Sequence, residues 1–227
     1  MTLSIAARCA ETGQLGVAIS SSSPAVAARC AWARAGVGAA CTQNITDPRL
    51  GTVLLDRMGQ GDSAPAAMAA VTKVEPLIAW RQLTAVDRNG LTAAWSGENT
   101  LGTYATANGP DCVAAGNLLA QSGVPSEMVS AFAGLPDGDL GNRLVAGLAA
   151  GLRAGGEAGP LRSAGLIIVS DVPWPVTDLR VDWSEEPIAE LTALWRHWRP
   201  QADAYRLRAL DPAAAPSYGV PGDEGRR

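Results

Sequence analysis

Lysine and histidine are almost absent from the sequence. Lys73 is the only lysine among 18 basic residues, and His197 is the only histidine. A mechanism that needs a catalytic lysine must therefore use Lys73, and a Ser-His-Asp triad or a histidine-rich metal site has almost no material to work with. The formal net charge of −4 argues against a strongly basic surface, so no nucleic-acid partner is expected.

Long apolar runs and metal-binding or nucleotide-binding motifs are also missing. No segment reaches the ~20 consecutive apolar residues of a transmembrane helix, and the first residues lack the basic and apolar regions of a secretion signal. We therefore expect a cytoplasmic protein with no membrane partner and with reduced cysteines. The four cysteines share no Cys-x-x-Cys spacing, so we expect buried thiols and no metal. No P-loop or GxGxxG motif follows a strand, so no nucleotide cofactor is expected.

Apolar residues make up 47% of the 227 positions, which is enough for one sizeable core. Alternating and turn patterns predict strands, and 3.6-residue periodicity with capping residues predicts helices. The predicted strands are 2–8, 15–21, 36–42, 80–86, 91–96, 102–107, 112–116, 163–170 and 176–181. The predicted helices follow Asp47 and Ser63, and then cover 125–133, 139–153 and the stretch from Ser184 to about Tyr205. The small-residue stretch 26–35 fits neither pattern.

Neighbouring predicted strands form hairpins, for example around Asn89-Gly90, a pair that favours a tight turn. Hairpins indicate antiparallel sheets, and the intervening helices should cover their outer faces. We therefore predict an α+β fold of layered sheets and helices. We expect one domain over 1–210, and a flexible tail over 211–227 because this stretch is rich in proline, alanine, glycine and charge.

Thr2 is the candidate nucleophile because it follows the initiator methionine. Methionine is usually removed before a small residue, and its removal would give Thr2 a free α-amino group beside its own hydroxyl. An α-amine has an unperturbed pKa of about 7.7–8.0, so it can accept a proton near neutral pH. One residue then supplies both nucleophile and base, and no histidine is required. The alternative is an ordinary second residue, as in many proteins that begin Met-Thr.

A series of short motifs resembles the DUF1028 family, which is assigned to the N-terminal nucleophile (Ntn) hydrolase superfamily. The matching stretches are Thr2–Arg8, Glu11–Ser21, Trp32–Ala39, Thr42–Asn44, Ser96–Glu98, Ala115–Leu119, Ala154–Gly156, Arg162–Ala164 and Asp178–Asp182. The resemblance covers roughly residues 2–198. It implies an αββα sandwich, with two antiparallel sheets between helical layers, and a Thr2 nucleophile that attacks an amide-type carbonyl. The acyl-enzyme mechanism needs preorganised donors for the oxyanion.

One position departs from the family pattern. Relatives often carry a lysine directly after the serine that matches Ser21, and here that position is Ser22. A cation near Thr2 would keep its amine neutral and available as a base. Arg34 is the remaining cation in the matching stretch, although it stays protonated and cannot itself act as a base. An ion pair or a solvated arginine is an equally good interpretation of Arg34.

Further polar residues are predicted at strand ends near Thr2. Ser20 and Ser21 end the second strand and could position the amine or the attacking water. Candidates for binding substrate or stabilising the oxyanion are Gln43, Asn44, Glu98, Asn117, Arg162 and Ser163. Each also has a structural interpretation, such as a Gly-Asn turn for Asn117 or an ion pair with Arg34 for Glu98.

We therefore expect an Ntn-type amidohydrolase that cleaves a C–N bond in a small amide, a cyclic amide or a short peptide, without metal or cofactor. One alternative is a catalytically silent domain of the same fold that binds a metabolite or assembles with partners. Another is a serine hydrolase in which Ser21 uses His197. The last helix carries Trp195 and Trp198, and an exposed aromatic patch there could form a homo-oligomer contact.

Overall fold

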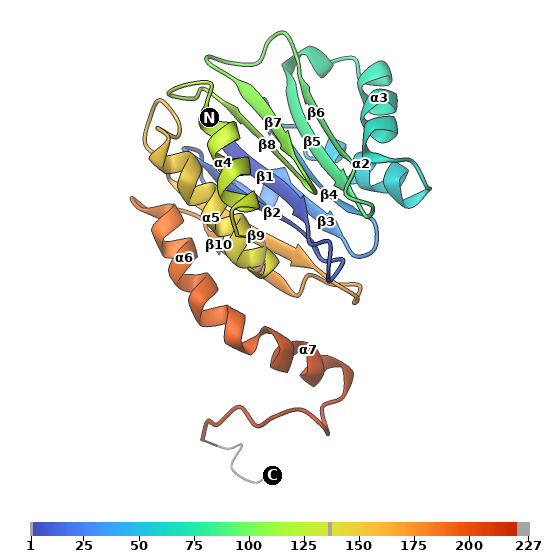
Figure 1. Ribbon diagram of the computed structural model, residues 1–227, viewed down its shortest axis with the longest axis vertical. Helices are drawn as coiled ribbons and strands as arrows, with labels where there is room; N and C mark the ends of the chain where they lie inside the picture. The colour runs from blue at the N-terminus through green and yellow to red at the C-terminus, as the bar shows by residue number, and fades with distance from the viewer. Residues whose placement is uncertain (1, 136–137, 222–227) are drawn as a thin grey trace.

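Two antiparallel sheets stacked face to face form the centre of the fold (Figure 1). The computed structural model describes residues 2–135 and 138–221. The strands are β1 (Thr2–Arg8), β2 (Leu15–Ser21), β3 (Ala31–Arg34), β4 (Gly38–Asn44), β5 (Arg81–Asp87), β6 (Thr92–Ser96), β7 (Ala105–Gly109), β8 (Cys112–Asn117), β9 (Ser163–Val169) and β10 (Thr177–Val181). One sheet has the order β10-β9-β2-β1-β8-β7, and the other has the order β3-β4-β5-β6.

Helices cover the outer face of each sheet. The four-stranded sheet packs against α2 (Arg49–Gly59) and α3 (Ala64–Val74). The six-stranded sheet packs against α4 (Val124–Ala133), α5 (Leu140–Arg153) and α6 (Pro187–Trp198). These layers confirm the predicted α+β fold, in which two antiparallel sheets lie between helices.

Strand β1 lies inside the six-stranded sheet, paired on both sides. It is antiparallel to β2 on one side and to β8 on the other. Because side chains alternate along a strand, Leu3 and Ile5 face the helices, whereas Ala6 packs in the apolar cluster between the sheets. Thr2 and Ser4 share the face of Ala6, so the fold directs both hydroxyls toward the second sheet.

Ser63 caps its helix as predicted, whereas the N-cap of α2 is Pro48, one residue after the predicted Asp47, and Pro48 has no side-chain cap hydrogen bond. Ser63 accepts a hydrogen bond from the Ala66 N–H at 3.3 Å and caps α3, and Asp139 accepts one from the Asn142 N–H at 2.8 Å and caps α5. Two apolar helix residues are exposed, and the first of them, Val53 of α2, is 40% exposed. Leu152, the last of the leucines spaced four apart in α5, is likewise exposed, because it lies in the last turn of the helix.

Two stretches took forms that the pattern did not indicate. The unassigned stretch contains α1 (Ala27–Cys30) followed directly by β3. The last helix ends at Trp198, continues as a 3₁₀ turn, η2 (Arg199–Gln201), and resumes as α7 (Ala202–Leu210), because Pro200 lacks the backbone N–H of a regular helix. Flexibility over 211–227 stays a prediction, and 222–227 lie outside the described residues. Within the described ranges, no helix has the length and apolar composition needed to cross a bilayer.

Candidate functional site

Four polar side chains stand in a row across the end of the six-stranded sheet. The strand registers pair Ser163 of β9 with Ser21 of β2, Ser21 with Thr2 of β1, and Thr2 with Asn117 of β8. All four are buried, and Thr2 is 5% exposed. Since buried polar groups are retained only with partners or for a function, this row marks the candidate site.

A chain of hydroxyl groups links Thr2 to a guanidinium. The Thr2 hydroxyl donates to Ser21 Oγ at 3.3 Å, and Ser21 Oγ lies 2.9 Å from Ser23 Oγ. Arg29 donates from Nη2 to Ser23 Oγ at 3.1 Å and from Nη1 to the Pro24 carbonyl at 2.7 Å. Arg29 is therefore a cation connected to Thr2 through side chains.

A network of amide side chains joins the two sheets beside Thr2. Ser4 donates to Gln43 Oε1 at 2.7 Å, and Gln43 Nε2 donates to Gln82 Oε1 at 2.8 Å. Asn117 Nδ2 donates to the same Gln82 oxygen at 3.0 Å, while Gln82 Nε2 donates to the Gly116 carbonyl at 3.0 Å. Within the described part of the chain, the Asn117 carbonyl oxygen has no hydrogen-bond partner. Gln82, which the sequence did not single out, is the centre of this network.

Ser20 and Ser163 hold the segment that follows β2. Ser20 Oγ donates to the Ser163 carbonyl at 2.8 Å, and Ser163 Oγ donates to the Ser23 carbonyl at 2.6 Å. The Ser163 hydroxyl also accepts from the Val26 N–H at 3.2 Å. These bonds fix the segment from which Ser23 reaches Ser21, so both serines support the site through other residues.

Arg34 lies away from Thr2. In the sheet it pairs with Gly38, whereas the site residue Gln43 lies five residues farther along β4, about 16 Å away. Its guanidinium pairs with Asp56 on α2 at 2.7 Å. The assignment of Arg34 as the cation near Thr2 is corrected accordingly, because β3 places it at the opposite end of the sheet.

Asn44 is the last residue of β4 and Glu98 lies two residues beyond β6, at the same end of the second sheet as Gln43. Asn44 has a positive φ of +72°, and its side chain donates to the Trp80 carbonyl at 2.7 Å and accepts from the Leu101 N–H at 3.1 Å. Asn44 thus stabilises the surrounding loops. Glu98 is exposed, and the expected ion pair with Arg34 is not formed, since Arg34 pairs with Asp56.

Arg162 contributes its backbone to this end of the sheet. Its N–H donates to the Ser21 carbonyl at 2.8 Å. Its guanidinium pairs with Glu185 and lies over the Trp183 ring, 5.7 Å from the centroid. The side chain is therefore engaged by the segment before α6.

The serine–histidine alternative is not supported by the arrangement. His197 is exposed on α6, which packs on the outer face of the six-stranded sheet, whereas Ser21 faces the second sheet. Lys73 is exposed on α3, on the far side of that second sheet. No group of three metal-binding side chains occurs in the described ranges. The cysteines are free and buried, as expected.

Glu157 is a site residue that the sequence did not reveal. It is 6% exposed and forms an isolated antiparallel bridge with Leu119, just beyond the end of β8. Burial raises the pKa of its carboxyl to about 7, while the positive charge at the start of the chain and the nearby Ser22 act in the opposite direction. The only local signal is Gly155-Gly156, whose positive φ values of +111° and +59° form the turn before it.

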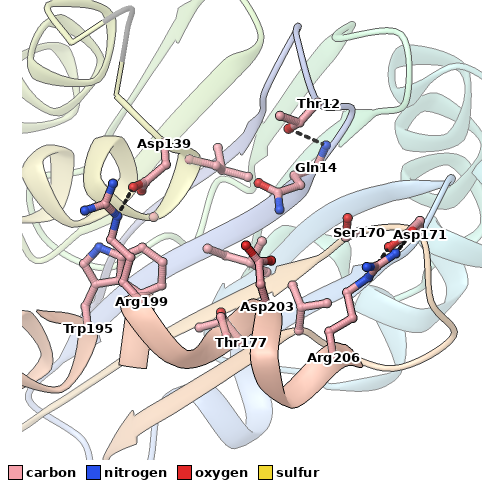
Figure 2. A pocket seen from close by; sticks show the side chains of 15 residues that line it. Thr12, Gln14, Asp139, Ser170, Asp171, Thr177, Trp195, Arg199, Asp203 and Arg206 are labelled. Atoms are coloured by element: carbon pink, nitrogen blue, oxygen red, sulfur yellow. Dashed lines mark hydrogen bonds and ion pairs between the residues drawn. The ribbon is translucent and has the colours of Figure 1, made fainter. Parts of the chain in front are cut away.

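A separate cavity of about 370 Å³ lies at the opposite end of the six-stranded sheet (Figure 2). Gln14 of the β1–β2 turn lines it, seven residues and about 20 Å along the strand from Ser21. Figure 2 shows two ion pairs at its wall, between Arg199 and Asp139 and between Arg206 and Asp171. The cavity is therefore distinct from the Thr2 site.

The chain is similar to a protein family and to a crystal structure over most of its length. The family model described as "Family of unknown function (DUF1028)" matches residues 2–191. The crystal structure of protein SPO2555 from Silicibacter pomeroyi, described with the same family, is 28% identical, has a TM-score of 0.79, and the match covers 86% of this chain and 88% of that one. No curated protein matches the sequence.

Two Anbu structures match with lower scores. Anbu (ancestral beta-subunit) from Yersinia bercovieri is 9% identical with a TM-score of 0.41, over 89% of this chain and 96% of that one. The Anbu (Gly-1) mutant from Hyphomicrobium sp. strain MC1 is 12% identical with a TM-score of 0.39, over 90% and 97%. Scores below 0.5 do not establish a common fold, so nothing about the site follows from these two.

Proposed function

This chain belongs to the DUF1028 family, and on that premise we propose that it is an Ntn-type amidohydrolase with Thr2 as its nucleophile. The observation that carries the proposal is the buried Thr2 hydroxyl, held on a strand paired on both sides and connected through Ser21 and Ser23 to Arg29. The proposal requires removal of Met1, which lies outside the described residues.

The proposed reaction uses the two groups of Thr2 in turn. The free α-amine takes the hydroxyl proton while Oγ1 bonds to the carbonyl carbon of the amide, which gives a tetrahedral oxyanion. Collapse of this intermediate breaks the C–N bond, and the α-ammonium returns its proton to the leaving amine. Water then attacks the resulting ester with the same amine as base, and the ester C–O bond breaks. The ammonium returns its proton to Thr2 Oγ1, and the carboxylic acid is released.

Arg29 takes the role that the sequence suggested for Arg34. A positive charge near an amine disfavours its protonated form and so keeps it available as a base. The same charge, transmitted along the hydroxyl chain, stabilises negative charge that develops on the Thr2 oxygen. Arg29 remains protonated throughout, so its contribution is electrostatic.

The burial of Thr2 favours small substrates. With 5% of its surface exposed, Thr2 is not accessible to the backbone of a folded protein. The surrounding row offers hydroxyl and amide groups, which suit a polar amide, a cyclic amide or a short peptide. The backbone N–H groups and Asn117 are the available kinds of oxyanion donor.

Intact mass and covalent labelling test the proposal together. The protein purified from cells should lack the mass of one methionine residue. A β-lactone should then acylate Thr2: the hydroxyl oxygen bonds to the lactone carbonyl, the ring C–O bond breaks, and the proton passes to the ring oxygen, so the adduct retains the full lactone mass.

Variants locate the reactive group. Thr2→Ala should abolish both labelling and turnover in a screen of small amides, and Thr2→Ser should retain part of each. Thr12→Ala, in the exposed turn at the other end of β1, serves as the matched control and should behave as the wild type. Retention of Met1, or labelling that persists in Thr2→Ala, would refute the hydrolase and favour a silent binding domain.

A further inference from the structure

Glu157 lies near the first residue of β1 but is not among the groups that carry out the proposed reaction. Strand β1 is flanked by β2 and β8, and both flanking chains continue beyond its first residue. On one side Ser22 follows Ser21, and on the other Leu118 and Leu119 follow Asn117. Glu157 is bridged to Leu119, and Ser22 lies close enough to influence its carboxyl. Glu157 therefore lies off the end of β1, where the backbone nitrogen of Thr2 is directed.

The carboxylate of Glu157 is buried, and Ser22 is the neighbour whose backbone and hydroxyl lower its pKa, although neither contact has the geometry of a full hydrogen bond. Both side-chain oxygens are shielded from solvent, and none of the described residues meets them at hydrogen-bond distance and angle. An isolated buried carboxylate is unfavourable, so a native protein retains one only where a partner or a function accounts for it. A cationic N–H donor placed at the end of β1 would provide both the missing charge and the missing hydrogen bond.

We propose that Glu157 is the positioning residue for the α-amine of Thr2, accepting an N–H hydrogen bond from it once Met1 has been removed. This inference rests on the proposed function, since only a processed chain has an α-amine at Thr2. The bond fixes the rotation of the amine about the Cα–N axis, so its lone pair points at the Thr2 hydroxyl when it is deprotonated. Glu157 acts through the amine and does not touch substrate.

Charged groups on both sides of the amine define its basicity. Glu157 favours the ammonium form, and Arg29, reaching Thr2 through Ser23 and Ser21, disfavours it. Glu185 and Glu186 line the same cavity of about 380 Å³ as Glu157, and Glu185 is engaged by Arg162. The Glu157 carboxylate therefore raises the pKa of the amine, and the Arg29 guanidinium lowers it.

The α-amine can be titrated directly. In protein labelled with ¹⁵N-threonine, the amine nitrogen gives a resonance distinct from the amides, and its shift against pH reports its pKa. Glu157→Gln keeps the side-chain shape and removes the charge, so it should lower the amine pKa by about 1–3 units. The β-lactone labelling rate should begin to rise at correspondingly lower pH, and its plateau should fall at least tenfold, because the neutral amide oxygen accepts a weaker hydrogen bond from the amine than the carboxylate does.

Two further variants separate positioning from a general loss of structure. Glu157→Asp keeps the charge on a shorter side chain. Its amine pKa should be close to the wild-type value, and its plateau labelling rate should lie between those of Glu157→Gln and the wild type. Glu186→Gln removes an acid from the same cavity and should match the wild type in both measurements. An amine pKa and a labelling profile that are unchanged in Glu157→Gln would overturn the inference while Thr2 remains the nucleophile. Met1 retention or labelled Thr2→Ala would instead overturn the proposed function itself.

Discussion

Replacing Gln82 by methionine should remove the centre of the network that joins the two sheets. Methionine has nearly the volume of glutamine, so the change deletes hydrogen bonds without opening a cavity. Four hydrogen bonds are lost. Gln82 Oε1 no longer accepts from Gln43 and Asn117, and Gln82 Nε2 no longer donates to the Gly116 carbonyl and Ser96 Oγ. Gln82, Gln43 and Asn117 are all almost fully buried, so water cannot replace these partners.

The magnitude follows from the number of bonds and from what is left behind. Four hydrogen bonds at about 1 kcal/mol each amount to about 4 kcal/mol of unfolding free energy. The amide groups of Gln43 and Asn117 remain buried without an acceptor, which places the loss at the upper end of the usual range for such bonds. We therefore expect Gln82→Met to destabilise the protein by about 3–5 kcal/mol, a large share of a typical domain stability.

Urea unfolding followed by circular dichroism measures this loss. Gln60→Met changes an exposed glutamine at the end of α2 and should alter stability by less than about 0.5 kcal/mol. In the double variant Gln43→Met with Gln82→Met, the loss of unfolding free energy should be smaller than the sum of the losses in the two single variants, because both substitutions delete the hydrogen bond between Gln43 and Gln82. A loss in Gln82→Met no greater than in Gln60→Met would refute the argument that this network stabilises the contact between the sheets.

Three further predictions test other parts of the structure. Arg29→Met should raise the pKa of the Thr2 amine and move β-lactone labelling to higher pH, whereas Arg34→Met should leave the profile unchanged. Burial raises the pKa of Cys41 to about 12, so iodoacetamide at pH 8 should modify it only after unfolding, as peptide mapping would reveal. Gly141→Ala places a Cβ inside van der Waals contact with the Trp195 ring of α6 and should lower the free energy of unfolding in urea by about 1–3 kcal/mol. Gly123→Ala, where a Cβ meets nothing within 4 Å, is its control.

Local pattern was sufficient for the strands other than β3 and for the starts of α3 and α5. The bounds of β1 and β2 follow from alternation and from the Thr12-Gly13 turn, and the starts of α3 and α5 follow from Ser63 and Asp139. These features depend on residues within a few positions of one another. The break between α6 and α7 could also have been anticipated, since Pro200 lies within the predicted helix.

The composition of the candidate site depended on contacts that no local pattern contains. Arg29 and Arg34 are five residues apart and chemically alike, yet the turn into β3 sends one toward Ser23 and the other to Asp56. Gln82 and Glu157 come from segments about 80 and 155 residues from Thr2 in the sequence. Gln82 meets Asn117 between the two stacked sheets, and Glu157 is bridged to Leu119 beyond β8.

Thr2 is the first residue of a strand inside the sheet, and this position limits where a tag can be attached to the protein. Any peptide fused ahead of Thr2 has to leave the sheet between the chain beyond β2 and the chain beyond β8, past Glu157. An amino-terminal affinity tag would thus lie beside Thr2, where the proposed substrate would bind. Tags, labels and surface attachment belong beyond α7, which Figure 1 shows at the far end of the molecule from the N-terminus.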